Sequence, residues 1–253
     1  MMPVKISVVS YLNTVPFLHG LNQPEVKSSI CLNIVPPAEC ARDLEIGKAD
    51  LALVPIAALP DIPHYEFIGD YCIGSTGPVR TVALLSNIPL AEIKHVYIDS
   101  ESRTSALLVK LLAKHYWKIS PAFKAISPKT TMQGETCMLI GDKVFEHENS
   151  YTYRYDLAEA WLHFSGKPFV FAAWATTKTL APDFTQAFNN ALRYGITHIP
   201  QAIKTEARQY DHAMALQYLT HNINYPFDEA KRAGMVEFWN LALEEVKSKV
   251  RSC

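Results

Sequence analysis

The sequence of 253 residues lacks the charge runs and the long apolar runs that mark several large classes of protein. Its formal net charge is -1, and no cluster of Lys and Arg indicates nucleic acid or an anionic membrane as a partner. No apolar segment approaches the roughly 20 residues that a membrane-spanning helix needs. The apolar stretch from Ile6 to Val9 is also too short for the core of a signal peptide, so we expect a cytoplasmic protein.

The residue patterns of metal, redox and nucleotide sites are missing as well. The five cysteines are scattered and include no pair at metal-ligand or redox spacing, which predicts reduced thiols. The nine histidines form no His-Glu-x-x-His or similar helical pair, so we expect no metal site. No P-loop, no Gly-x-Gly-x-x-Gly after a strand and no Gly-x-Ser-x-Gly occurs. These absences exclude the common NTPase, dinucleotide-binding and hydrolase classes.

What the sequence contains is an alternation of strand-like and helix-like segments. Its 49% hydrophobic content allows a substantial core. Alternation of this kind predicts an α/β protein with a largely parallel sheet. From Ala175 onward the pattern is helical only, and we expect the last helix to begin at Pro226. The expected strands are Val4 to Val9, Ile30 to Val35, Ala49 to Val54, Glu66 to Tyr71, Val79 to Leu85, His95 to Ile98, Thr136 to Ile140 and Pro168 to Ala173.

Two extended runs, 79–85 and 169–173, predict crossings of the chain between two lobes. They enclose an α/β segment of about 90 residues, which is a usual size for a domain. We expect one discontinuous lobe made of residues 1–84 and 175–253 and a second, inserted lobe made of residues 85–174. Bilobed proteins with this layout close a ligand cleft around a small molecule.

Polar residues follow the first expected strand, where an α/β sheet usually binds its ligand. Tyr11 and Asn13 come shortly after Val9. The amide of Asn13 can both donate and accept, which suits the orientation of a hydroxyl or a carboxylate; an ordinary turn is the other interpretation. Pro55 ends a second buried strand, and the backbone near it is a candidate wall of the same site.

Further candidates lie at the first expected crossing. The small polar loop around Ser75 and Thr76 contains glycines that permit close approach of the backbone to a ligand. A hairpin turn explains these glycines equally well. Thr81 lies in the crossover strand, and its hydroxyl should be available to a ligand.

A third group opens the helix expected at 106–117. Arg103 is the best candidate for a carboxylate contact, because its planar guanidinium can make two parallel bonds. Thr104 and Ser105 would add hydroxyls and helix-start N–H groups. Ser100 or Ser102 would cap this helix whatever the function.

Gly141 and Asp142 follow the strand expected at 136–140. Asp142 is the carboxylate placed at a strand end in the inserted lobe. Its more ordinary role would be to cap a helix that starts at Lys143.

Five motifs in register resemble the chorismate dehydratase family of the futalosine route to menaquinone. They run in order across most of residues 4–175, and the tail from Ala181 contributes little. The resemblance implies a type II periplasmic-binding-protein fold, with two lobes and a ligand cleft between them. The motifs are Ser10-Tyr-Leu-Asn-Thr-x-Pro, Gly47-x-x-Asp50-x-Ala-Leu-Val-Pro, Gly77-x-Val-x-Thr-Val, Asp99-x-x-Ser-Arg-Thr-Ser and Ile140-Gly-Asp.

The resemblance also implies a carbon–oxygen lyase that converts chorismate to 3-[(1-carboxyvinyl)oxy]benzoate without a cofactor. Asn13 would be the catalytic polar residue, and Thr81 would occupy a ligand-contact position where many relatives have Ser. Arg103 with its two neighbours would hold a substrate carboxylate. Since no His or Glu in these motifs is an obvious general base, the enolpyruvyl carboxylate of the substrate itself is the expected proton acceptor.

Two other functions stay open. The sister family of the same pathway has the same fold and acts on a cyclic futalosine derivative, but its first strand ends in a Ser-Pro-Cys-Pro-Asn-Asp type of motif where this chain has Ser10-Tyr-Leu-Asn. A non-catalytic intracellular carboxylate-binding protein is the other alternative, and turnover separates it from an enzyme. The sequence leaves the oligomeric state open.

Overall fold

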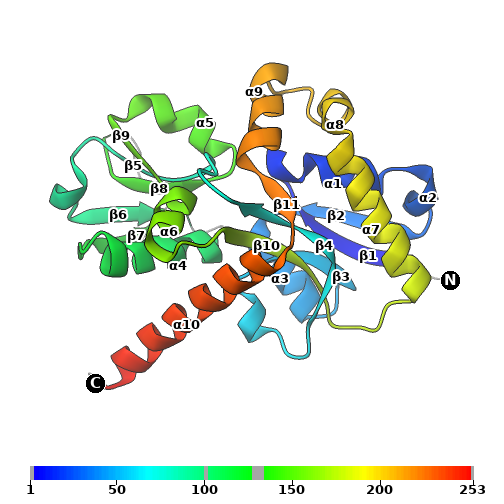
Figure 1. Ribbon diagram of the computed structural model, residues 1–253, viewed down its shortest axis with the longest axis horizontal. Coiled ribbons are helices and arrows are strands. Elements are labelled where there is room, and N and C mark those ends of the chain that lie inside the picture. Colours follow the sequence, from blue (N-terminus) through cyan, green and yellow to red (C-terminus); the bar gives the residue numbers. More distant parts are fainter. Residues whose placement is uncertain (1–2, 100–101, 127–133, 252–253) are drawn as a thin grey trace. The chain divides into compact units, whose positions relative to one another are not determined.

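The computed structural model describes residues 3–99, 102–126 and 134–251, which form two units with a sheet each (Figure 1). The first unit comprises Met1–Gly74 and Phe171–Asp228, and the second comprises Ser75–Val170 and Glu229–Cys253. The chain therefore passes between units about ten residues earlier than the expected bound at 84 and four residues before 175. It passes once more after Asp228, so the C-terminal helix belongs to the second unit instead of the first.

The first unit contains a six-stranded sheet with the order β11-β4-β10-β3-β1-β2. β1 (Val4–Val9) pairs in parallel with β2 (Ile30–Val35) and with β3 (Leu51–Pro55). β10 (Phe169–Thr176) is antiparallel to β3, and β11 (Asn224–Pro226) is antiparallel to β4 (Glu66–Ser75). The sheet is thus mixed and not largely parallel, because the strand that returns from the second unit runs against β3.

Helices α1 and α7 of the first unit pack closely together (Figure 1). A Cβ added at Gly20 would lie 1.8 Å from the Ala191 carbonyl oxygen, and one at Gly195 would lie 1.7 Å from that of Pro16. Glycine is therefore required at both positions. The helices of this unit are α1 (Val15–Leu21), α2 (Pro24–Lys27), α3 (Pro37–Glu45), α7 (Pro182–Thr197), α8 (Ile199–Glu206) and α9 (His212–Gln217), followed by a π-helical turn (Tyr218–Asn222).

The second unit contains a five-stranded sheet with the order β7-β6-β8-β5-β9. β6 pairs in parallel with β7 and β8, whereas β5 is antiparallel to β8 and β9. The sequence pattern missed β7, β9 and β11, which are short and carry few buried residues. The strands are β5 (Val82–Ser86), β6 (His95–Ile98), β7 (Ala122–Ala125), β8 (Cys137–Ile140) and β9 (Tyr153–Asp156).

The last helix begins later than the sequence suggested. Pro226 lies in β11, and the N–H of Phe227 still bonds to the Asp70 carbonyl at 2.7 Å, which keeps the chain extended beside β4. α10 then starts at Glu229 and runs to Arg251. The other helices of the second unit are α4 (Arg103–Leu111) with a π-helical continuation (Leu112–Tyr116), α5 (Lys143–His147) and α6 (Leu157–Ser165).

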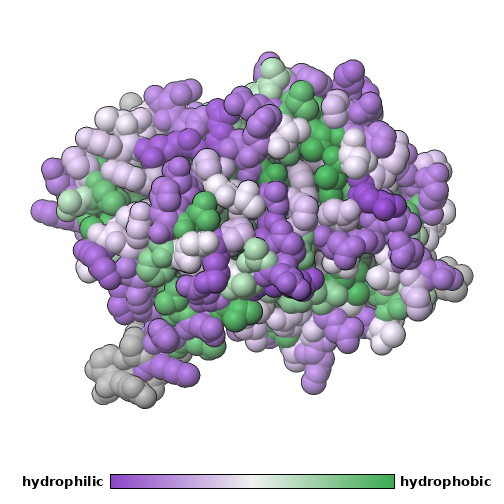
Figure 2. Space-filling model, viewed as in Figure 1, coloured by the Kyte–Doolittle hydropathy of each residue, from purple (hydrophilic) through white to green (hydrophobic). Residues whose placement is uncertain are grey.

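Each unit has an aromatic core of its own. In the first, Trp174 packs edge-on against Phe17 and Phe188, with ring centroids 5.6 and 5.1 Å apart. In the second, Phe169 packs edge-on against Trp161 and Phe238 at 5.4 and 5.3 Å. Polar and apolar residues are interspersed over the face in Figure 2. Within the described residues, no helix is both long enough and apolar enough to cross a membrane.

Candidate functional site

Expected site residues of the first unit lie at one edge of its sheet. β1 and β3 run in parallel with Ile6 opposite Leu51, so both strands end at the same edge. Tyr11 and Asn13 follow β1, and Pro55 is the last residue of β3. The structure therefore brings these three candidates together.

The turn that contains Asn13 is held at its carbonyl oxygens. Asn13 lies in a 3-10 turn, Leu12–Thr14, which we call the Asn13 turn. The Thr14 hydroxyl lies 2.7 Å from the carbonyl oxygens of both Val9 and Tyr11 and can donate to either. The Tyr225 hydroxyl donates to the Asn13 carbonyl at 3.0 Å. Hydroxyl groups thus hold the backbone of the turn and leave the Asn13 side chain outside these bonds.

The side-chain oxygen of Asn13 is buried and has no hydrogen-bond partner. A buried polar atom left in this state costs about 1–3 kcal/mol, and in a native protein it calls for an explanation. The indole N–H groups of Trp161 and Trp174 are also buried without a partner, but both rings belong to the aromatic cores. Asn13 is the one of the three at a strand end, where a ligand can satisfy it.

Tyr225 was missed by the sequence reasoning. It lies in β11, within the tail that the pattern indicated as helical, and no motif marks it. Burial raises the pKa of its phenol well above the ordinary value, and the nearby Tyr218 adds to the effect. The hydroxyl therefore keeps its proton and stays a donor to the Asn13 turn.

Expected residues of the second unit also meet at one sheet edge. Val82 lies opposite Ile140, and the Gly141 N–H donates to the Thr81 carbonyl at 2.8 Å. β6 ends at the same edge because it is parallel to β8, and the Asp99 N–H donates to the Met138 carbonyl at 3.2 Å. Thr81, Gly141 and Asp142 are therefore neighbours along this edge.

The start of α4 is capped by Ser102. Its hydroxyl oxygen accepts the Ser105 N–H at 3.1 Å and its proton goes to the Ser105 hydroxyl at 2.9 Å, which confirms the expected cap; Ser100 lies outside the described residues. Thr104 and Ser105 are buried, whereas Arg103 is exposed. Of these helix-start residues, Arg103 is the one that presents its side chain to solvent.

Ser75 and Thr76 differ in their surroundings. The buried Ser75 hydroxyl donates to the Gly77 carbonyl at 2.6 Å and accepts the Gly77 N–H at 3.2 Å. These bonds are those of a local turn, the alternative that the sequence left open for this loop. Thr76 is exposed.

Asp142 does not make the capping bond that its position suggested. It stands at the N-terminus of α5, but its side chain accepts no bond from the helix backbone. Beside it, Lys143 pairs with Asp99 at 2.9 Å between Nζ and Oδ2. The sequence reasoning missed this pair, because only the pairing of β6 with β8 brings the two segments together.

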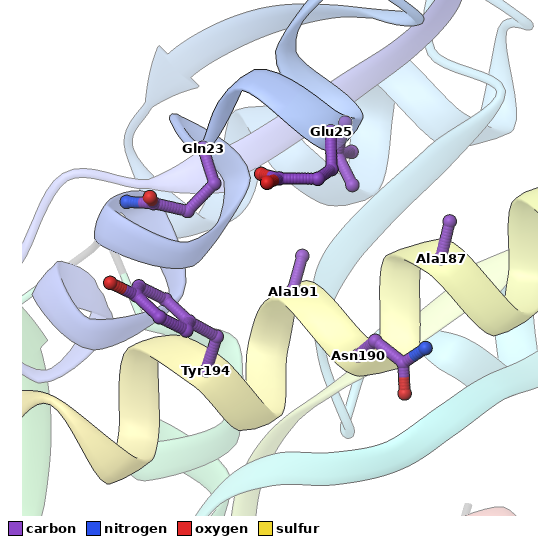
Figure 3. A pocket seen from close by; sticks show the side chains of 7 residues that line it. Gln23, Glu25, Ala187, Asn190, Ala191 and Tyr194 are labelled. Atoms are coloured by element: carbon purple, nitrogen blue, oxygen red, sulfur yellow. The ribbon is translucent and has the colours of Figure 1, made fainter.

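Pockets within the single units lie elsewhere. In the first unit, a pocket of about 410 Å3 lies between α7 and the segment around α2 (Figure 3). In the second, a pocket of about 180 Å3 borders Trp117 and Asp156. None of the expected site residues lines either pocket. Among the described residues, no group of three or more His, Cys, Asp or Glu side chains could hold a metal ion.

A family model described as menaquinone biosynthesis matches residues 4–244. The chain belongs to this menaquinone biosynthesis family. It is similar to the chorismate dehydratase of Thermus thermophilus, with 27% identity over 94% of this chain and 94% of the relative. These matches confirm the resemblance that the five motifs carried.

Solved structures of similar proteins show the fold of this member of the menaquinone biosynthesis family. A protein from Archaeoglobus fulgidus matches with a TM-score of 0.77 and 14% identity, over 96% of this chain and 97% of that one. The periplasmic aliphatic sulphonate binding protein of Escherichia coli matches with a TM-score of 0.63 and 14% identity, over 99% and 88%. A Candida albicans protein described as having the generic periplasmic binding protein fold matches at 0.63 and 13%, over 97% and 91%. The expected periplasmic-binding-protein-like α/β fold is confirmed.

Proposed function

We propose that the protein is a carbon–oxygen lyase that dehydrates chorismate to 3-[(1-carboxyvinyl)oxy]benzoate in menaquinone biosynthesis. The family match and the similarity to a chorismate dehydratase along nearly the whole chain support this reaction. The observation that carries the assignment of the site is the buried Asn13 Oδ1 without a partner at the carboxyl edge of β1 and β3.

The proposed reaction asks mainly for positioning. One C–O bond and one ring C–H bond of chorismate break, the hydroxyl and the proton leave as water, and the ring becomes aromatic. Aromatisation supplies the driving force, so the protein gains most by holding the reacting groups in a productive geometry. The Asn13 amide offers an acceptor and two donors on a backbone that Tyr225 holds. In this proposal it orients the leaving hydroxyl or a reacting carboxylate.

The second unit would supply contacts to a substrate carboxylate. Arg103 is exposed at the start of α4, where a guanidinium and a positive helix end both favour an anion. Thr81 directly precedes β5, is buried, and lies at the same sheet edge as Gly141. We assign Arg103 to binding and Thr81 to contact with the ring substituents.

Turnover of chorismate by the purified protein, followed by absorbance and product mass, tests the proposal. We expect the benzoate product from the wild type, and a fall of about 100-fold or more in kcat for Asn13→Ala, as for the loss of a preorganised polar contact. Asn240→Ala is the matched control, since Asn240 is exposed on α10. Full turnover by Asn13→Ala would remove Asn13 from the reaction.

A binding protein is the second candidate, because the aliphatic sulphonate binding protein shares the fold. In that case chorismate would raise the melting temperature without any product. Turnover of a cyclic futalosine derivative instead of chorismate would move the protein to the sister reaction.

A further inference from the structure

The turn before β5 has a backbone conformation that needs outside support. The Thr81 N–H donates to the Val79 carbonyl at 2.9 Å, which closes a three-residue turn, Val79–Thr81, with Arg80 at its centre. We call it the Thr81 turn. Arg80 has φ 68°, a left-handed value that residues with a side chain rarely adopt. Such strain persists only where the surroundings impose it.

Asp156 holds this turn with both of its carboxylate oxygens. Oδ2 accepts the Arg80 N–H at 2.7 Å, and Oδ1 accepts the Val79 N–H at 3.1 Å. Oδ1 also accepts the N–H groups of Ala158 and Glu159 at 3.0 and 3.1 Å, which caps α6. The cap uses Oδ1 alone. Oδ2 serves the Thr81 turn and lies 3.6 Å from Arg154 Nη2.

The rest of Arg80 is held from the same unit. Arg154 Nη2 donates to the Arg80 carbonyl at 2.8 Å. The Arg80 guanidinium pairs with Glu148 at 3.2 Å and lies 5.2 Å from the centre of the Phe145 ring. The N–H, the carbonyl and the side chain of Arg80 therefore each have a defined partner.

The position of Thr81 follows from these contacts. Its N–H closes the turn, its carbonyl accepts the Gly141 N–H at 2.8 Å, and its side chain is buried. The Cα and Cβ atoms of Thr81 can therefore shift only if the turn shifts. We propose that Asp156 is a positioning residue of the reaction: its Oδ2 holds the strained Thr81 turn in the geometry that presents the Thr81 hydroxyl to the substrate. This inference rests on the proposed function, in which Thr81 contacts chorismate.

Asp156→Asn separates the two roles of this side chain. The amide oxygen can replace Oδ1, where three N–H groups converge, so the cap of α6 is kept. The amide NH2 then faces the Arg80 N–H. Both groups are hydrogen-bond donors, so the bond to Arg80 is lost. We expect kcat with chorismate to fall by about tenfold to 100-fold while KM changes little, since a small misplacement costs rate more than binding.

Asp211→Asn is the matched control. Asp211 is also a helix cap, which accepts only the Met214 N–H at 2.8 Å in the first unit. We expect its kcat to stay at the wild-type value. Amide hydrogen exchange of the peptide 77–84 adds a readout that does not depend on turnover, and it should rise in Asp156→Asn and not in Asp211→Asn.

The outcomes distinguish the two proposals. A wild type that leaves chorismate unchanged overturns the proposed function, and the positioning role for that reaction with it. An active wild type together with an Asp156→Asn variant of unchanged kcat overturns the positioning role alone. If Asp156→Asn does not fold, Arg154→Ala replaces it, because Arg154 is exposed and bonds the same turn. We then expect a fall in kcat of about threefold, and an unchanged kcat overturns the inference.

Discussion

The Asn13 turn and the Thr81 turn are held in opposite ways. In the first unit, neutral hydroxyls of Thr14 and Tyr225 donate to carbonyl oxygens. In the second unit, a carboxylate accepts from N–H groups, and charged side chains surround it. The Asn13 turn is a regular 3-10 turn, whereas the Thr81 turn contains a left-handed Arg80.

The difference has a physical reason. Hydrogen bonds to charged groups are stronger than those between neutral groups, so a carboxylate can hold a strained turn. A regular turn needs less support, and neutral donors hold it without sensitivity to salt. Both turns are held by residues that lie far away in the sequence. Tyr225 is 212 residues from Asn13, and Asp156 is 76 residues from Arg80.

The largest effect should come from the packing beneath the Asn13 turn. Gly195→Ala places a Cβ 1.7 Å from the Pro16 carbonyl oxygen, so α1 and α7 must separate. We expect the free energy of unfolding, measured in urea, to fall by about 3 kcal/mol. Gly77→Ala beside the Thr81 turn is the control for stability, since an added Cβ meets nothing within 4 Å there. Equal stability of the two variants would contradict the close packing.

Tyr225→Phe tests the neutral support. It leaves the Asn13 carbonyl without this donor, and we expect the unfolding free energy to fall by about 1 kcal/mol. If the Asn13 turn positions substrate, kcat should fall by about tenfold, with the same ratio at low and high salt. Tyr194→Phe, on the exposed side of α7, serves as the control. A loss of kcat that depends strongly on salt would contradict the view that neutral groups hold the Asn13 turn.

Asp43 in the first unit and Asp156 in the second are buried carboxylates. We expect their contributions to the free energy of unfolding to depend on pH with opposite signs. Desolvation raises the pKa of Asp43, but hydrogen bonds from Ser7, Lys48 and Asn33 outweigh it, so the net pKa is lowered. Desolvation raises the pKa of Asp156, and the N–H donors that act against it do not reverse the rise.

A lowered pKa in the folded state means that Asp43 stabilises the fold above its unfolded pKa and loses this contribution as the pH falls through its folded pKa. We expect Asp43→Asn to reduce the unfolding free energy by about 1–3 kcal/mol at pH 7, and by less as the pH approaches 3. For Asp156 the sign is reversed, because ionisation is disfavoured in the folded state. Its own contribution to stability therefore falls as the pH rises above its unfolded pKa. Unfolding curves of the wild type and the two Asp→Asn variants across this range measure both signs.

The smallest effect concerns the surface charges around the Thr81 turn. Arg154 lies 3.5 Å from Glu148 and is exposed, so its ion pairs are screened by salt. Added salt should lower the unfolding free energy of the wild type by about 0.5 kcal/mol more than that of Arg154→Ala. Parallel salt titrations check this difference. In the same titration, the unfolding free energy of Tyr225→Phe should change with salt as that of the wild type does. A different salt dependence would show that charge contributes to the support of the Asn13 turn.

Sequence patterns located most of the strands of the first unit. β1, β2 and β6 have the expected bounds, because runs rich in β-branched and other apolar residues mark them in the sequence. α3 ends two residues before Gly47, whose φ of 72° is a left-handed value that glycine adopts readily after a helix. The patterns located β4, β5, β8 and β10 as strands but did not give their antiparallel pairing, since pairing direction depends on the path of the chain between units.

The sequence by itself determined the family, the kind of fold and the short motifs that follow the strands, because these depend on residues near one another in the chain. It also marked Asn13 and Thr81. Only the tertiary structure decided what holds these two residues in place. Tyr225 and Asp156 lie outside the motifs, and their bonds to the turns form only when the folded sheets bring distant segments together.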